Sequence, residues 1–260
     1  MHRVFVNGEE GGRIAPDDPG LLLGLTVFET MRTYHGVPFR MDKHLRRMSA
    51  SAKSMDISID DVQKIAEDVL DTLERCSPDT DVRIRLTFTA GGSQIIDVSS
   101  LDTDKVGRSL SVGTLEWNPP SYLPGIIKHG SRASWVMASR DQGVPEVLLV
   151  DSKGNILEAS RSNVFAVRNG VILTPEHDSR FLQGVTRGAL IEAASRANLK
   201  LRETHLPLHE RYDELYLSST LKQLAPVECI SNQPAPGGGP VGEALREAFL
   251  ALVDQETANA

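Results

Sequence analysis

The stretch "LPGIIKHGSRASW", residues 123–135, places Lys128 directly after two isoleucines. An aliphatic run of this kind is typical of a buried strand. A charged amine at the end of a buried run costs free energy unless another group uses it. Lys128 is therefore a candidate reactive amine, although a lysine at the end of a strand is usually a solvated edge residue.

The composition excludes several classes of protein. The chain has 260 residues, a net charge of -7 and 40% hydrophobic residues, which suits one large domain or two smaller ones. An acidic chain is not expected to bind nucleic acid, and no apolar run reaches the roughly 18 residues of a membrane helix. Only Cys76 and Cys229 are present, and the histidines lack metal-ligand spacing, so we predict no metal site. The first residues lack a signal-peptide core, and we expect a cytoplasmic protein.

Proline residues suggest where the chain divides. The segment "NPPSYLPG", residues 118–125, holds three prolines, which resist both helix and central strand. We predict an α/β (α+β) protein with a smaller N-terminal domain over 1–116, a linker over 117–124 and a larger C-terminal domain over 125–260. Periodicity predicts helices over 42–55, 59–76, 131–143, 184–199 and 241–256, with Asp42 as the cap of the first. Alternation predicts strands over 3–8, 81–92, 109–117 and 214–227. It predicts pairs of strands over 26–41, 146–160 and 163–175, separated at His35-Gly36, at residues 153–155 and at Asn169-Gly170, and Asn7-Gly8 is a hairpin signal.

Four features could together describe one site. Lys128 ends an aliphatic run, Glu158 interrupts an apolar strand, Thr186 lies where a loop enters a helix, and Ser219 and Thr220 follow a strand. Helix starts bind phosphate through unpaired N–H groups. A buried carboxylate needs a cationic partner, and a desolvated lysine can form a Schiff base. A ligand with an aldehyde, a pyridine nitrogen and a phosphate satisfies all four, which describes pyridoxal 5′-phosphate (PLP). Taken singly, the hydroxyl residues could be plain helix caps and Glu158 an exposed strand residue.

Five ordered motifs resemble the class IV, or fold type IV, PLP-dependent enzymes. That family includes branched-chain and D-amino-acid aminotransferases and 4-amino-4-deoxychorismate lyase. The resemblance covers nearly the whole chain. The motifs are "GLTVFETMRTYHGVPFRMDKHLRRM" with His44 and Arg47, "GIIKH" with Lys128, "LEASRSNVFAVRNGVILTP" with Glu158, Asn163 and Phe165, "LQGVTR", and "LSSTLKQLAPV".

The resemblance implies a role for each matched residue. Lys128 would form the Schiff base with PLP and move the substrate proton, and Glu158 would pair with the pyridine nitrogen. Leu182 would pack on the cofactor ring, and Phe28 would line the substrate pocket. The residues implied to hold the phosphate are Arg47, Val185, Thr186, Ser219 and Thr220. We interpret His44 as structural.

The substrate side departs from the family patterns. D-amino-acid aminotransferases place an arginine and a histidine where this chain has "AGG", residues 90–92. Arg32 and Arg85 could form an alternative clamp for a substrate carboxylate, or both could face solvent. Arg161 stands where relatives mostly carry a small residue, and could contact the phosphate or narrow the pocket.

The preferred prediction is an aminotransferase that acts on a small amino acid, with the D-enantiomer as an option, and on a 2-keto acid such as 2-oxoglutarate or pyruvate. The alternative is the lyase that releases pyruvate and 4-aminobenzoate. A non-catalytic PLP carrier and a nucleotide-binding module are weaker alternatives, because Lys128 and Glu158 are intact and no Gly-x-Gly-x-x-Gly fingerprint follows a strand. The resemblance also implies a homodimer, because family members close the pocket with a loop of the partner subunit.

Overall fold

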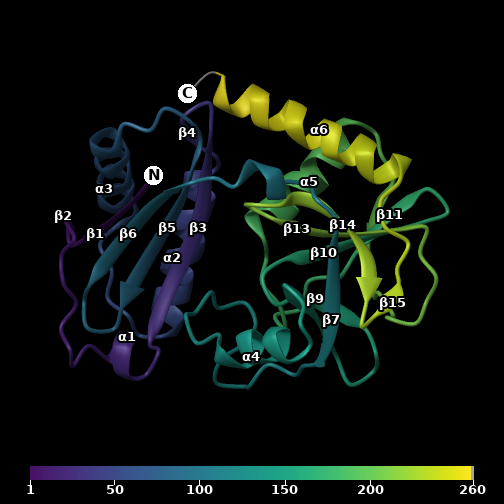
Figure 1. Cartoon of the computed structure of the whole chain (residues 1–260), viewed down its shortest axis with the longest axis horizontal. Helices are drawn as coiled ribbons and strands as arrows, with labels where there is room; N and C mark the ends of the chain where they lie inside the picture. Colours follow the sequence, from purple (N-terminus) through teal and green to yellow (C-terminus); the bar gives the residue numbers. More distant parts are fainter. Residues whose placement is uncertain (259–260) are drawn as a thin grey trace. The chain divides into compact units, whose positions relative to one another are not determined.

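The computed structural model describes residues 1–258, which form two units (Figure 1). Of the described residues, unit 1 comprises Met1–Asp102, Ile127–Ser131 and 254–258, and unit 2 comprises Thr103–Ile126 and Arg132–Val253. Each unit has its own sheet, and helices pack with both, so the predicted α/β class is confirmed. Among the described residues, no helix combines the length and apolar character needed to cross a membrane.

Unit 1 is built on a six-stranded antiparallel sheet with the order β2-β1-β6-β5-β3-β4. Its strands are β1 (His2–Val6), β2 (Glu9–Glu10), β3 (Thr26–Tyr34), β4 (Val37–Pro38), β5 (Val82–Thr89) and β6 (Gln94–Ser100). The two predicted hairpin turns are confirmed, because Asn7-Gly8 and His35-Gly36 all adopt the positive φ that such turns require. Strand β6 was not predicted from the sequence.

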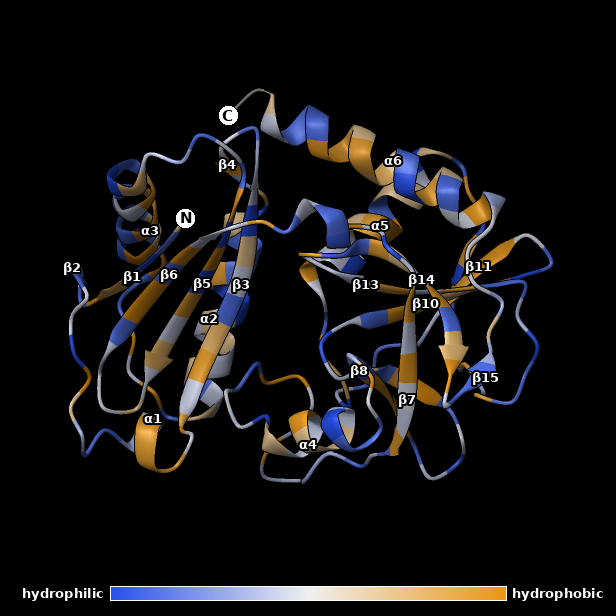
Figure 2. Cartoon of the chain, viewed as in Figure 1, coloured by the Kyte–Doolittle hydropathy of each residue, from blue (hydrophilic) through white to orange (hydrophobic). Residues whose placement is uncertain are grey.

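Three helices accompany this sheet: α1 (Pro19–Leu22), α2 (Met41–Ser54) and α3 (Val62–Cys76). Asp61 caps α3 by accepting from two backbone N–H groups. The prediction that Asp42 caps α2 is wrong. The N-cap of α2 is Arg40 in a left-handed conformation, which moves Asp42 into the first turn. Helix α1 appears in hydrophobic colours in Figure 2, and Leu21, Leu22 and Leu23 around its end are more than 60% exposed.

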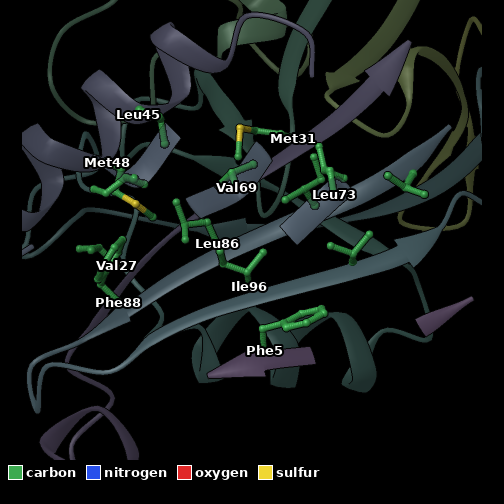
Figure 3. Packing of buried hydrophobic residues seen from close by; sticks show 14 of the residues in the cluster. Phe5, Val27, Met31, Leu45, Met48, Val69, Leu73, Leu86, Phe88 and Ile96 are labelled. Atoms are coloured by element: carbon green, nitrogen blue, oxygen red, sulfur yellow. The ribbon is translucent and has the colours of Figure 1, made fainter. Parts of the chain in front are cut away.

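The core of unit 1 lies between its sheet and helices α2 and α3 (Figure 3). Because side chains alternate along a strand, Val27 and Met31 of β3 enter this core. Phe28 and Arg32 consequently project from the opposite face of the sheet. The sheet therefore separates an apolar face under the helices from a face that carries candidate site residues.

Unit 2 contains a nine-stranded mixed sheet with the order β12-β11-β10-β13-β14-β7-β8-β9, and β15 also pairs with β14. Its strands are β7 (Leu110–Glu116), β8 (Glu146–Val150), β9 (Ile156–Ala159), β10 (Asn163–Arg168), β11 (Val171–Thr174), β12 (Leu201–Glu203), β13 (Glu214–Ser219), β14 (Gln223–Ile230) and β15 (Gln233–Pro234). Its helices are η1 (Thr103–Lys105), α4 (Ala133–Asp141) and α5 (Val185–Arg196), and α6 (Pro240–Thr257) begins there. Strands β8 and β9 are buried along their whole length, as a strand covered on both faces must be.

The units divide the chain differently from the predicted boundaries at 116 and 125. Strand β7 pairs in parallel with β14 and β8, so residues 103–126 belong to unit 2, including the proline-rich segment. Residues 127–131 return to unit 1, because His129 bridges to Val27 and Gly130 N–H donates to Thr26 at 2.9 Å. Lys128 is consequently not in a strand, contrary to the expectation from its aliphatic neighbours.

Candidate active site

Lys128 is fixed in unit 1 through its backbone. Its N–H donates to the Ser51 hydroxyl of α2 at 3.1 Å, and its carbonyl accepts from the N–H of Phe28 at 3.0 Å. The amine Nζ lies 4.8 Å from the centre of the Phe28 ring, within range of a cation–π contact. Helix α2 and strand β3 therefore hold the backbone N–H and the carbonyl of Lys128, and its side chain lies beside an aromatic ring.

A buried carboxylate joins the two residues of the His-x-x-Arg motif. Glu29 of β3 has no exposed surface and accepts from Arg47 Nε at 2.7 Å, Arg47 Nη2 at 2.6 Å and His44 Nδ1 at 2.7 Å. Burial alone would raise the pKa of Glu29, but the charge of Arg47 and the bonds from Arg47 and His44 outweigh burial. The pKa of Glu29 is therefore held far below its ordinary range. The sequence analysis did not identify Glu29 as a functional residue. A signal was available, because Glu29 alternates with Val27 and Met31 and therefore lies on the core face of the strand, where a charged residue needs a partner.

His44 is buried beside this carboxylate. Burial lowers the pKa of His44, and the positive charges of Arg47 and Lys128 lower it further, while the bond to Glu29 acts in the opposite direction. The net shift is downward, so His44 stays neutral near pH 7 and donates its Nδ1 proton to Glu29. This geometry agrees with a structural role for His44.

The arginines that were candidates for a carboxylate clamp lie on the sheet face opposite the helices. In the β3–β5 register Arg32 faces Arg83 and Thr30 faces Arg85, so Arg32 and Arg85 are diagonal neighbours on one face. The Arg85 guanidinium lies 3.9 Å from the centre of the Phe28 ring. Burial, followed by repulsion from Arg83, lowers the pKa of Arg85.

Arg32 is the most unusual of these side chains. It is only 6% exposed, and its guanidinium stacks 4.1 Å above the Tyr34 ring. Its Nε donates to the Thr33 carbonyl at 3.3 Å, but its Nη1 has no hydrogen-bond partner among residues 1–258. Arg83 donates through Nη2 to Asp97 at 2.5 Å, although its Nε also has no partner among the described residues. A buried cation with an unsatisfied donor is costly, which indicates a place for an anion.

Unit 2 contributes a buried carboxylate, Glu158, from strand β9. Its Oε2 accepts from the Leu182 N–H at 3.3 Å and from Asn163 Nδ2 at 3.4 Å. Asn163 Nδ2 also donates to the Leu182 carbonyl at 2.9 Å, which ties the loop before α5 to strand β10. Glu158 is 8% exposed, so these neutral donors orient a carboxylate that is largely removed from water.

The start of α5 lies beside the same asparagine. Gly184 is its N-cap, and a Cβ on Gly184 would be 2.0 Å from Asn163 Oδ1, so only glycine fits this approach. Val185 and buried Thr186 form the first turn, whose N–H groups suit an anion. Ser218 pairs with Asn163 across the sheet, and its buried hydroxyl has no partner within the described part of the chain.

The turn after strand β13 carries two further hydroxyl residues, Ser219 and Thr220. Ser219 ends β13 and Thr220 enters the turn to β14, and the Ser219 hydroxyl accepts from the Lys222 N–H at 3.3 Å. Unit 2 thus brings together Glu158, Leu182, the first turn of α5 and the Ser219–Thr220 turn. The side chain of Arg161 instead donates to the Pro145 carbonyl, which places its guanidinium on that backbone group.

The chemistry of these groups fits PLP. The buried carboxylate of Glu158 suits a protonated pyridine nitrogen. A helix start and the unsatisfied hydroxyl of Ser218 suit a phosphate. The primary amine of Lys128 suits an aldehyde. The predicted contacts of each residue with the cofactor remain predictions.

Comparison with known proteins gives consistent matches. A family model described as "Amino-transferase class IV" matches residues 26–230. The chain is 29% identical to the branched-chain-amino-acid aminotransferase of Escherichia coli strain K12, with 98% of this chain and 94% of that protein covered. A solved branched-chain aminotransferase of Thermoproteus uzoniensis with norvaline has the same fold, with a TM-score of 0.88 at 22% identity over 98% of this chain and 96% of that one. A PLP-bound hypothetical aminotransferase of Mycobacterium tuberculosis gives a TM-score of 0.87 at 23% identity, covering 98% of this chain and all of that one.

The buried histidine predicts a specific loss of stability in acid. The folded-state pKa of His44 lies below its unfolded value, so the unfolded chain binds a proton that the folded chain excludes. Stability therefore falls as the pH drops through about 6.5, by up to about 1.4 kcal/mol per pH unit. We expect His44→Gln to reduce the fall in thermal unfolding midpoint between pH 7.5 and 5.5. Exposed His205→Gln serves as the control and should keep the wild-type fall, and an unchanged fall in His44→Gln would contradict the assignment.

Proposed function

Because the chain belongs to the class IV aminotransferases, the fold type IV family of PLP-dependent enzymes, we propose that it moves an amino group between an amino acid with a small apolar side chain and a 2-keto acid. The observation that carries this proposal is Arg32, a buried guanidinium with an unsatisfied Nη1 on the same sheet face as Arg85 and Phe28. Branched-chain amino acids are the first candidates, because they are the substrates named for the E. coli relative.

Each residue has a separate task in this reaction. When bound, PLP supplies the electron sink that stabilises negative charge at the substrate Cα. Lys128 would hold the cofactor covalently and, once its amine is freed by the substrate, its Nζ would carry the proton from the substrate Cα to the cofactor. Glu158 keeps the ring nitrogen protonated, and Leu182 covers the ring. The phosphate is held by Arg47, Val185, Thr186, Ser219 and Thr220.

The substrate carboxylate is assigned to Arg32 and Arg85. A guanidinium donates a fork of N–H groups that matches a carboxylate, and such charge-assisted bonds are stronger when water is excluded. Phe28 lies against Arg85 and Lys128 and gives the same region an apolar surface for a short side chain. The arginines thus fix the acid group while Phe28 limits the side chain.

The first test uses one half of the reaction. Purified enzyme with PLP is mixed with a panel of L- and D-amino acids, without a keto acid, and the absorbance is followed for conversion to the pyridoxamine form. We expect branched-chain amino acids to convert the wild type and no amino acid to convert Lys128→Ala, which lacks the proton carrier. Conversion by D-amino acids alone would assign the enzyme to D-amino acids. Conversion by none, with pyruvate released from 4-amino-4-deoxychorismate, would replace transamination by the lyase reaction.

The second test concerns the arginines. Arg32→Gln and Arg85→Gln each remove a charge-assisted contact worth roughly 1.5–3 kcal/mol, so each should raise KM for the amino acid by about tenfold or more. Arg46→Gln on the exposed face of α2 is the matched control and should leave KM within about twofold. KM is measured by steady-state kinetics. An unchanged KM in both Arg32→Gln and Arg85→Gln would remove the carboxylate clamp from the proposal.

We also propose that the enzyme is a homodimer. Leu21, Leu22 and Leu23 form an exposed apolar cluster at α1, and such a cluster is typical of an interaction surface. Multi-angle light scattering should give twice the mass of one chain, and Leu22→Glu should shift the protein toward the monomer because it places a charge in the contact. A wild-type monomer that retains full activity would contradict this assignment.

A further inference from the structure

We propose that the Glu146–Lys222 ion pair is a positioning device that holds two turns of the PLP site together and thereby sets the affinity for the cofactor. Neither residue is assigned a contact with PLP. The inference rests on the proposed function, because it takes PLP as the ligand of unit 2. Both residues, and both turns, belong to that unit.

Glu146 is the buried carboxylate that accepts from both turns. It begins strand β8, has no exposed surface, and forms an ion pair with Lys222. Its Oε2 accepts from the Arg161 N–H at 3.2 Å, and its Oε1 accepts from the Ser162 hydroxyl at 3.2 Å. Arg161 and Ser162 lie in the short turn between β9 and β10, with Glu158 on one side and Asn163 on the other. One carboxylate therefore holds the turn that presents the predicted partner of the ring nitrogen.

Lys222 reaches the same carboxylate from the other turn. It lies between β13 and β14, and its N–H donates to the Ser219 hydroxyl at 3.3 Å. Its carbonyl accepts from the Gly107 N–H at 3.1 Å, and its Nζ is 3.5 Å from the Ser162 hydroxyl. The Lys222 side chain thus connects the turn with the predicted phosphate residues Ser219 and Thr220 to Glu146 and Ser162.

The burial of Glu146 makes this connection sensitive to either partner. Removing one member of a buried ion pair leaves an uncompensated charge, which is far more disruptive than removing both. Without Lys222, the Glu146 carboxylate must gain water or move, and the turn at Arg161 and Ser162 would move with it. Without the charge of Glu146, the Lys222 side chain would no longer be held, and the Ser219–Thr220 turn would loosen.

The experiment measures PLP binding to the apo-enzyme in a double-mutant cycle. The proteins are the wild type, Lys222→Met, Glu146→Gln, the double variant, and Lys153→Met, an exposed lysine of the same unit, as the control. We expect each single variant to raise the Kd for PLP about tenfold, the double variant to be no weaker than the worse single variant, and Lys153→Met to match the wild type. Lys222→Arg should restore most of the affinity, because it keeps the ion pair.

Other outcomes separate the alternatives. Weak binding in Lys222→Met with wild-type binding in Glu146→Gln would make Lys222 a direct phosphate ligand and overturn the proposal. Lower thermal midpoints with unchanged Kd values would show that the pair only stabilises the fold, and would also overturn it. If Lys222→Met does not fold, Glu146→Gln and Lys222→Arg decide the same question. A wild type that binds no PLP would instead contradict the proposed function itself.

Discussion

Unit 1 depends on the burial of one carboxylate, that of Glu29, between Arg47 and His44. Because a buried charge must be compensated, this carboxylate fixes helix α2 against strand β3 at two successive turns. The same helix face extends to Ser51, whose hydroxyl accepts from the Lys128 N–H. The position of Lys128, the predicted catalytic lysine, in unit 1 therefore follows from a polar contact network as well as from the apolar core.

Unit 2 also buries the carboxylates of Glu146 and Glu158, the second of which is the predicted partner of the pyridine nitrogen. Glu146 is paired with a cation and joins two turns, whereas Glu158 is oriented by neutral donors from Asn163 and Leu182. A buried carboxylate of this kind suits a cationic ligand group such as a protonated pyridine nitrogen. Arg32 in unit 1 is a buried cation whose Nη1 has no hydrogen-bond partner among the described residues, which is why it is the proposed anchor for a substrate carboxylate.

The sequence predicts most of the local structure and less of the site. Helix periodicity located α3 and α5, and the Asn-Gly and His-Gly turns located the hairpins, because these signals lie within a few residues. Residues 127–131 were misjudged, because their place beside β3 depends on hydrogen bonds to residues about 100 positions earlier. Glu29 and Glu146 were missed for the same reason: a charged residue in a strand shows no partner in the sequence. The family motifs supplied the candidate residues, and the structure adds how each is supported.

The most direct test of this account is chemical labelling of the lysine that holds the cofactor. Borohydride reduces the Schiff base between PLP and its lysine to a stable amine, and digestion followed by mass spectrometry then locates the label. We predict a single labelled peptide, with the pyridoxyl group on Lys128. A label on another lysine, such as Lys222 beside the predicted phosphate loop, would contradict the assignment of Lys128 and the roles derived from it.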